Sequence, residues 1–220
     1  MADPFIKYDI GGACHWKWYL VNFGGYRDFT NTLVDLIPDA GRFLDVGCGD
    51  GLVSYLFFRS GFNVVGIDTS ETGIQLAKLV CEKALKESLG TDVEDVQGTP
   101  YTKGDQGLMI ERLEEGQLQF RNQSIYEFTE SNAFDYAICS EVIEHLEHPE
   151  QLLENVHRAI RKFAIITTPD GLQPGGAIEK PGVYDYHAWS PETFAELLKS
   201  YKFEFLDLRP GTIAVKIYKS

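Results

Sequence analysis

The first motif of this chain runs through residues 42–51 and reads Arg42-Phe43-Leu44-Asp45-Val46-Gly47-Cys48-Gly49-Asp50-Gly51. An apolar run ends near a carboxylate, glycine then recurs at every second position, and the helix-compatible run Leu52–Arg59 follows. Glycine tolerates positive φ and lets a ligand approach the backbone closely. The amides at a helix start can bind an anion or a polar ligand. The motif therefore predicts a strand, a ligand-binding turn and a helix.

The glycine spacing narrows the class of ligand. A P-loop would close with Lys-Ser or Lys-Thr, and a dinucleotide fingerprint reads G-x-G-x-x-G, whereas this turn reads G-x-G-x-G. A second strand, Asn63–Asp68, ends in an acid, and a carboxylate at that place can accept hydrogen bonds from both hydroxyls of a ribose. The pattern indicates a ligand with an unphosphorylated ribose, and Asp45 suits a positively charged amino group on that ligand.

Composition indicates one globular domain. The chain has 220 residues, 44% of them hydrophobic, and a net charge of −13, which lowers the expectation of a nucleic-acid substrate without excluding it. We expect no membrane span, because no apolar run approaches about 20 residues. We expect no signal peptide, because the N-terminus lacks a basic region followed by a hydrophobic run. Four cysteines stand singly, with no C-x-x-C pair, which favours reduced thiols and a cytoplasmic location.

A third motif lies at residues 134–145 and reads Phe134-Asp135-Tyr136-Ala137-Ile138-Cys139-Ser140-Glu141-Val142-Ile143-Glu144-His145. With the glycine turn and the Asp68 strand end, it resembles the class I S-adenosylmethionine-dependent methyltransferases from about Arg42 to the C-terminus. The resemblance implies an α/β fold, Rossmann-like and doubly wound, with a seven-stranded, mostly parallel sheet and an antiparallel last strand. It also implies an enzyme with S-adenosyl-L-methionine as cofactor. Residues 42–220 would be the methyltransferase domain, and residues 1–41 a helical lid segment.

The remaining elements follow from periodicity and turn residues. We expect a short helix at Tyr26–Ile37, a helix at Ser70–Glu87 with Ser70 as its N-cap, and helices that begin at Pro149 and at Ser190-Pro191. The expected later strands are Leu118–Arg121, Phe134–Cys139, Phe163–Thr168, Lys202–Leu208 and Thr212–Tyr218. Leu89–Gly116 is predicted to be an insertion, and Gly171–Tyr186 a loop.

The resemblance also implies a set of cofactor-binding residues. Asp45 and Asp68 are the main candidates, although each could instead only cap the helix that follows it. Gly47 and Gly49 would line the methionine end, while Gly51 would serve helix packing. The other cofactor-binding candidates are Thr69, Gln123, Ser124 and Ser140.

Residues after the fourth expected strand could carry the chemistry. If the segment turns helically, Glu141, Glu144 and His145 share a face, and two carboxylates with an imidazole suit Mg²⁺ or Mn²⁺. Alternatively, His145 or His187, with Glu144, acts in acid–base catalysis, since an imidazole titrates near neutrality. We expect His145 and His187 to line one pocket.

Two branches of the family carry a similar segment. The ubiquinone-biosynthesis O-methyltransferases would imply a small-molecule acceptor with a hydroxyl, which is the leading prediction. The small-RNA 2′-O-methyltransferases would imply a metal-assisted RNA ribose methyltransferase. A third alternative is a non-catalytic partner subunit. In the aromatic N-terminal segment, His15 and Trp16 are either pocket residues under a lid or, as we favour, part of a helix that packs on the sheet.

Overall fold

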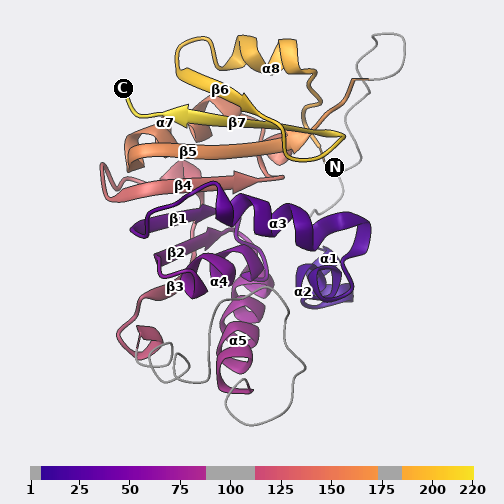
Figure 1. Ribbon diagram of the computed structural model, residues 1–220, viewed down its shortest axis with the longest axis vertical. Helices are drawn as coiled ribbons and strands as arrows, with labels where there is room; N and C mark the ends of the chain where they lie inside the picture. The colour runs from indigo at the N-terminus through magenta and orange to yellow at the C-terminus, as the bar shows by residue number, and fades with distance from the viewer. Residues whose placement is uncertain (1–5, 88–111, 173–184) are drawn as a thin grey trace.

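The computed structural model describes residues 6–87, 112–172 and 185–220 (Figure 1). Most of the predicted insertion Leu89–Gly116 and of the predicted loop Gly171–Tyr186 therefore lies outside the described residues.

Within these ranges, seven strands form one sheet in the order β3-β2-β1-β4-β5-β7-β6. The strands are β1 (Arg42–Val46), β2 (Asn63–Asp68), β3 (Leu118–Asn122), β4 (Phe134–Ser140), β5 (Ile160–Pro169), β6 (Lys202–Leu206) and β7 (Thr212–Tyr218). β1 to β5 pair in parallel, whereas β7 runs antiparallel to both β5 and β6. The predicted doubly wound sheet with an antiparallel last strand is confirmed.

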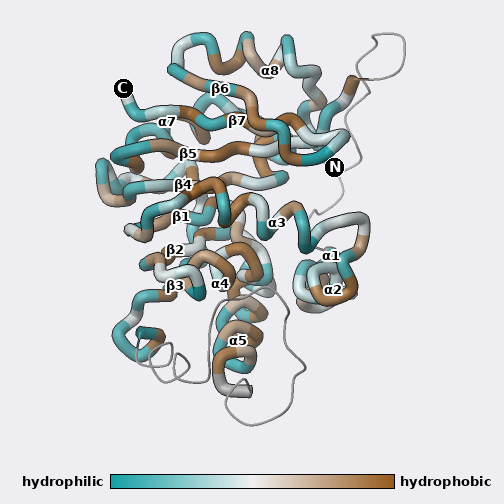
Figure 2. Tube along the Cα trace, viewed as in Figure 1, coloured by the Kyte–Doolittle hydropathy of each residue, from teal (hydrophilic) through white to brown (hydrophobic). Residues whose placement is uncertain are grey.

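Helices cover both faces of the sheet (Figure 1). They are α1 (Ile6–Gly11), α2 (Cys14–Leu20), α3 (Tyr26–Asp35), α4 (Leu52–Arg59), α5 (Glu71–Glu87), α7 (Pro149–Ala159) and α8 (Pro191–Leu197), with 3-10 turns at Phe23–Gly25, Ile125–Glu127 and Ile143–His145. One hydrophobic core joins α3, α4 and α5 to the sheet, and a second core joins α7 and α8 to it. Figure 2 shows hydrophobic residues concentrated along β4 and β5 in the middle of the sheet, as burial on both faces requires.

The expected elements are present, with small differences at their ends. The bounds of β2, α4 and β7 agree with the sequence prediction, whereas β5 begins three residues earlier, at Ile160 rather than Phe163. Ser70 precedes α5 and its hydroxyl accepts a hydrogen bond from the Gly73 amide at 3.0 Å, as expected of an N-cap. α1 and the 3-10 turns were not predicted, because such short pieces carry little periodicity.

None of the helices in the described ranges combines the length and the hydrophobicity needed to cross a bilayer.

Candidate active site

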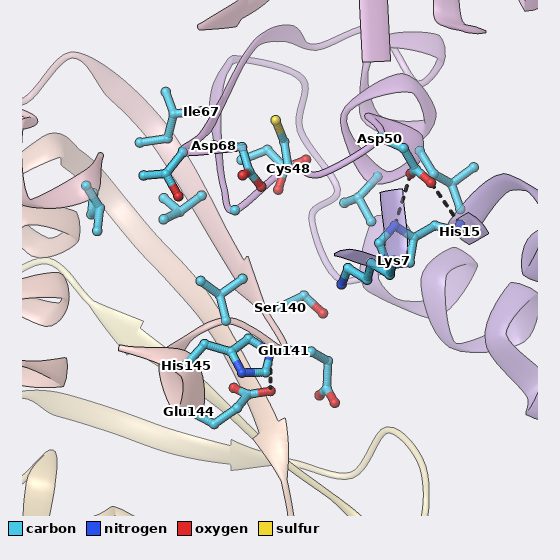
Figure 3. Close-up of a pocket in the computed structure, with 18 of the residues that line it drawn as sticks. Lys7, His15, Cys48, Asp50, Ile67, Asp68, Ser140, Glu141, Glu144 and His145 are labelled. Atoms are coloured by element: carbon cyan, nitrogen blue, oxygen red, sulfur yellow. Dashed lines mark hydrogen bonds and ion pairs between the residues drawn. The ribbon is translucent and has the colours of Figure 1, made fainter. Parts of the chain in front are cut away.

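A cavity of about 480 Å³ lies at the carboxyl ends of β1, β2 and β4. Its walls come from the glycine turn after β1, the ends of β2 and β4, the N-terminal helices and the loop that joins β6 to β7. This is the edge at which open α/β sheets bind ligands, beside the point where the strand order reverses. Figure 3 shows the labelled lining residues around this space.

The glycine turn is packed tightly on several sides. Gly47 and Gly49 have φ of 73° and 53°, and a Cβ added to Gly47 would lie 2.3 Å from Cγ2 of Val142. A Cβ added to Gly49 would lie 2.1 Å from the hydroxyl of Tyr8 in α1. Because Gly47 and Gly49 have no side chains, neighbouring protein groups can pack against the turn, and a ligand can still approach its backbone.

Asp45 is a buried acid at the end of β1, with 3% of its surface exposed. One of its oxygens accepts a hydrogen bond from the Ser54 hydroxyl of α4 at 2.6 Å. Burial raises the pKa of the Asp45 carboxyl to about 7, and the charge of Asp68 adds to this rise, while the Ser54 hydrogen bond opposes it. Asp45 lines the cavity and also accepts a hydrogen bond from the Ser54 backbone amide in the first turn of α4, so a place in the cavity wall and a capping contact are combined.

Asp68 holds the glycine turn in place from the end of β2. Its two carboxylate oxygens accept hydrogen bonds from the amides of Gly49, at 2.8 Å, and Ser70, at 2.7 Å. Burial raises the pKa of Asp68 above its ordinary value, and the two amides oppose that rise. Asp68 therefore has a structural role in addition to its place in the cavity wall.

Most of the other predicted cofactor residues also line the cavity. Thr69, Gln123, Ser124 and Ser140 are among the lining residues, whereas Gly49 is not. The Ser124 hydroxyl also accepts a hydrogen bond from the Tyr126 amide at 3.1 Å, which caps the 3-10 turn after β3. A Cβ at Gly51 would lie 2.7 Å from the Cβ of Ala77 in α5, in agreement with the predicted packing role.

Two glutamates follow β4 and face the cavity. Glu141 adopts a left-handed φ of 57°; its carboxylate accepts a hydrogen bond from Thr167 at 3.0 Å and lies 3.8 Å from Nη2 of Arg209. Glu144 is 3% exposed and accepts a hydrogen bond from Thr168 at 3.2 Å. Burial, followed by the charge of Glu141, raises the pKa of Glu144 to about 8.

His145 lines the cavity and forms a pair with an acid that sequence reasoning missed. Its Nδ1 lies 2.8 Å from Oδ1 of Asp185, and its Nε2 lies 3.9 Å from Oε1 of Glu144. A carboxylate accepts and does not donate, so Nδ1 carries the proton in this pair. Asp185 is 40 positions beyond His145 in the sequence, and no local pattern links the two.

His187 is not among the residues that line the cavity. Its amide donates to the Glu144 carbonyl at 3.3 Å, which keeps its backbone near the site. Its ring, however, stacks on Trp189 with 5.0 Å between centroids. The prediction that both histidines line one pocket is therefore wrong in this structure, because aromatic packing orients the second ring.

The predicted metal ligands line the same cavity, but their ligand atoms do not form one compact cluster. Glu141, Glu144 and His145 all line the cavity, yet their ligand atoms do not all lie within 4.8 Å of one another. In the described ranges, the one group of three or more His, Cys, Asp or Glu side chains that meets this distance is Cys14, His15 and Asp50.

The N-terminal helices are attached to the glycine turn through Asp50, which is fully buried. Its carboxylate accepts hydrogen bonds from the His15 amide at 2.8 Å and pairs with the His15 ring at 3.0 Å. The Trp16 indole donates to the Asp50 carbonyl at 2.9 Å. His15 lines the cavity, as does Lys7, but Trp16 does not. The sequence analysis assigned no role to Asp50, because its partners are more than 30 positions away in the chain.

The fold and the cavity together define a class: an α/β protein with a ligand site at the carboxyl edge of a doubly wound sheet, built from a glycine turn and two strand-end acids. The comparison with protein families then gives the family. The chain belongs to the methyltransferase domain family, which matches residues 21–207. This confirms the resemblance on which the sequence predictions depended.

Curated relatives cover only part of the chain. This chain is 32% identical over 127 residues to the ubiquinone biosynthesis O-methyltransferase of Rickettsia canadensis (strain McKiel). The matched stretch is 57% of this chain and 41% of that protein. It is 26% identical over 125 residues to the protein of the same name from Pasteurella multocida (strain Pm70). Here the matched stretch is 57% of this chain and 44% of that protein. The matches thus span less than half of the relatives' length.

Solved structures agree on the fold. The PH0226 protein from Pyrococcus horikoshii OT3 superimposes with a TM-score of 0.63 at 19% identity, covering 90% of both chains. The magnesium protoporphyrin IX methyltransferase from Synechocystis PCC 6803 superimposes with a TM-score of 0.61 at 16% identity, covering 100% of this chain and 99% of that one.

Proposed function

We propose that this protein is an S-adenosyl-L-methionine-dependent methyltransferase that transfers a methyl group to a hydroxyl of a small molecule. One observation carries the proposal: the strand-end acids Asp45 and Asp68 and the His145–Asp185 pair belong to the same cavity. A cofactor held by the two acids and an acceptor beside the imidazole would then share one cavity.

The residues present fit the cofactor. Each Asp68 oxygen accepts one amide hydrogen bond and retains acceptor capacity for a ribose hydroxyl. Asp45 has one oxygen on Ser54, and its second oxygen is suited to the ammonium of the methionine end. Bringing a cation beside Asp45 would also favour the ionised carboxylate, which burial alone disfavours.

When bound, the cofactor supplies a methyl group already activated on a sulfonium. The chain's own residues then have to place the acceptor in line with the sulfur and take its proton. We assign proton removal to His145, because Asp185 holds the Nδ1 proton and leaves Nε2 to accept one. Glu144 is buried beside His145, and burial raises the pKa of its carboxyl to about 8, which favours the protonated acid at neutral pH.

A divalent cation is the second candidate for the cluster after β4. Two carboxylates and an imidazole are suitable ligands for Mg²⁺ or Mn²⁺, but their ligand atoms do not all lie within 4.8 Å of one another. The sequence also left open an RNA substrate and a non-catalytic partner role. The relatives named as ubiquinone biosynthesis O-methyltransferases support a small-molecule acceptor instead.

We further propose that the N-terminal segment, residues 1–41, covers the cavity over the glycine turn and that the protein acts in the cytoplasm. His15, Trp18 and Tyr26 of this segment line the cavity, which supports the covering role. All four cysteines are free and buried, as expected in a reducing compartment.

Calorimetric titration with S-adenosylhomocysteine tests the cofactor, and a panel of phenolic and catecholic acceptors tests the reaction. We expect Asp68→Ala to abolish binding of the product. His145→Gln should leave binding intact and lower the turnover number by about 100-fold or more, since general base catalysis contributes about that much. Absence of binding to the wild-type protein would contradict the proposal, and full turnover by His145→Gln would remove His145 as the base.

A further inference from the structure

Three side chains of types that bind metals meet where α2 reaches the glycine turn. Cys14 and His15 are the first two residues of α2, and Asp50 belongs to the turn. One ligand atom of each side chain lies within 4.8 Å of the ligand atoms of the other two. Figure 3 shows the His15 ring directed at the Asp50 carboxylate. The methyl transfer proposed above gives this group no role.

Asp50 is a fully buried acid in negatively charged surroundings. Among the described residues, its ion-pair partner is the His15 ring, with Nδ1 3.0 Å from Oδ1. Burial and then the charges of Asp68 and Asp50 raise the pKa of the neighbouring Tyr8 hydroxyl. Because a buried carboxylate is ordinarily paired with a cation or bound to a metal, this place favours an additional positive charge.

The spacing of the three ligand atoms is close to that of a tetrahedral ion site. Zinc binds sulfur at about 2.3 Å and nitrogen or oxygen at about 2.0–2.2 Å, so tetrahedral ligand atoms lie about 3.3–3.7 Å apart. Nδ1 of His15 and Oδ1 of Asp50 are 3.0 Å apart, and no separation within the group exceeds 4.8 Å. Movements of about 1 Å would therefore bring all three atoms to the distances that zinc requires.

Hydrogen bonds already orient two of the three side chains. Oδ2 of Asp50 accepts from the His15 amide at 2.8 Å, which keeps Oδ1 beside the ring. The Trp16 indole donates to the Asp50 carbonyl at 2.9 Å. Contacts of this kind orient metal ligands and strengthen metal binding. His15 and Asp50 also line the cavity, from which water can reach a fourth ligand position.

We infer that Cys14, His15 and Asp50 form a Zn²⁺ site that fastens the start of α2 to the glycine turn. A thiolate, an imidazole and a carboxylate are ligands that zinc takes, whereas Mg²⁺ prefers oxygen ligands. On binding, the Cys14 thiol releases its proton to solvent, and the neutral His15 ring carries its proton on Nε2 instead of Nδ1. No step of methyl transfer passes through this ion, and the site is separate from the acids after β4.

Co²⁺, which replaces Zn²⁺ and is visible spectroscopically, tests the site. It is titrated into metal-free, full-length protein, and Zn²⁺ is then added in competition. We expect the sulfur-to-cobalt charge-transfer band of a tetrahedral thiolate site, which Zn²⁺ should erase. Cys14→Ser should lose this band and bind Zn²⁺ at least about tenfold more weakly. Zn²⁺ should raise the unfolding temperature of the wild type far more than that of Cys14→Ser.

Cys48→Ser is the matched control. Cys48 is a buried thiol that lines the cavity but is not one of the three grouped residues, so this variant should keep both the band and the effect of Zn²⁺ on unfolding. His15→Gln is the second test variant and should also bind Zn²⁺ at least about tenfold more weakly. A wild type without the charge-transfer band, or wild-type Zn²⁺ affinity in Cys14→Ser or His15→Gln, would overturn the site.

Discussion

Replacing Asp45 by asparagine should change how the stability of this protein depends on pH. The Asp45 carboxyl has a pKa of about 7 in the folded protein, against an ordinary value of 3.8, chiefly because it is buried. The folded state therefore holds a proton that the unfolded state has already released. The sign follows from linkage: the free energy of unfolding falls as pH rises between these two values.

The change in the free energy of unfolding that Asp45 causes between the two pH values is large enough to measure. Between about pH 5 and about pH 7, Asp45 should cost the wild type on the order of 2 kcal/mol of stability. Asparagine has no proton to lose, so that part of the slope should disappear in Asp45→Asn. Other buried acids, such as Glu144, titrate in both proteins and cancel in the comparison. Urea unfolding at the two pH values, followed by circular dichroism, measures the difference.

Ser54→Ala provides a control in which the pKa of Asp45 should rise, so that its effect on stability is kept rather than removed. The Ser54 hydroxyl donates to Asp45 at 2.6 Å and lowers its pKa. Without this bond, the pKa of Asp45 should rise further, so the loss of stability should extend to higher pH. Parallel pH profiles for the wild type and Asp45→Asn would refute the reasoning, because they would mean that Asp45 ionises alike in both states.

Three shorter predictions concern packing, capping and metal. Gly51→Ala should destabilise the protein by about 2 kcal/mol or more in thermal or urea unfolding. The φ of Gly51 is 80°, and the new Cβ would lie 2.7 Å from Ala77 and 2.9 Å from Phe120. Unchanged stability would contradict this packing. Ser190→Ala should cost about 1 kcal/mol in the same assay, because Ser190 and Thr193 form a capping box at the start of α8, while a Ser190→Asp protein should retain most of the stability. Removal of divalent cations with a chelator should leave methyl transfer in place if an imidazole is the base; a loss that Mg²⁺ restores would instead assign the carboxylates after β4 to a metal.

The sequence alone predicted the central part of the fold because its signals are local. Apolar runs that end in acids, and a glycine turn between a strand and a helix, predicted β1 before the turn and placed α4 and β2 at the bounds that the structure has. The acids Asp45 and Asp68 were predicted for the same reason, since each stands at a strand end. The hydrogen bonds of these acids to Ser54 and Gly49 were not predicted, because they join different elements.

The two histidines that line the cavity are paired with acids that are distant in the sequence. His145 meets Asp185, and Asp50 meets His15, through the tertiary fold alone. His187 shows the converse: its backbone reaches Glu144 as expected, but its ring packs on a neighbouring aromatic. Spacing in the sequence could place these residues near the cavity but could not orient their side chains.

The central place of β1 in the sheet has a consequence for biosynthesis. β2, the inner neighbour on one side, follows soon after β1 in the chain, whereas β4, the neighbour on the other side, comes much later. The hydrogen bond from the Arg42 amide to Asp135 spans 93 positions. A nascent chain that has emerged only as far as β3 can bring Asp45 and Asp68 together, but its β1, buried at four of five positions in the finished protein, is then an open edge. The half of the molecule that holds Asp45 and Asp68 therefore exposes a strand edge to aggregation until β4 has been translated.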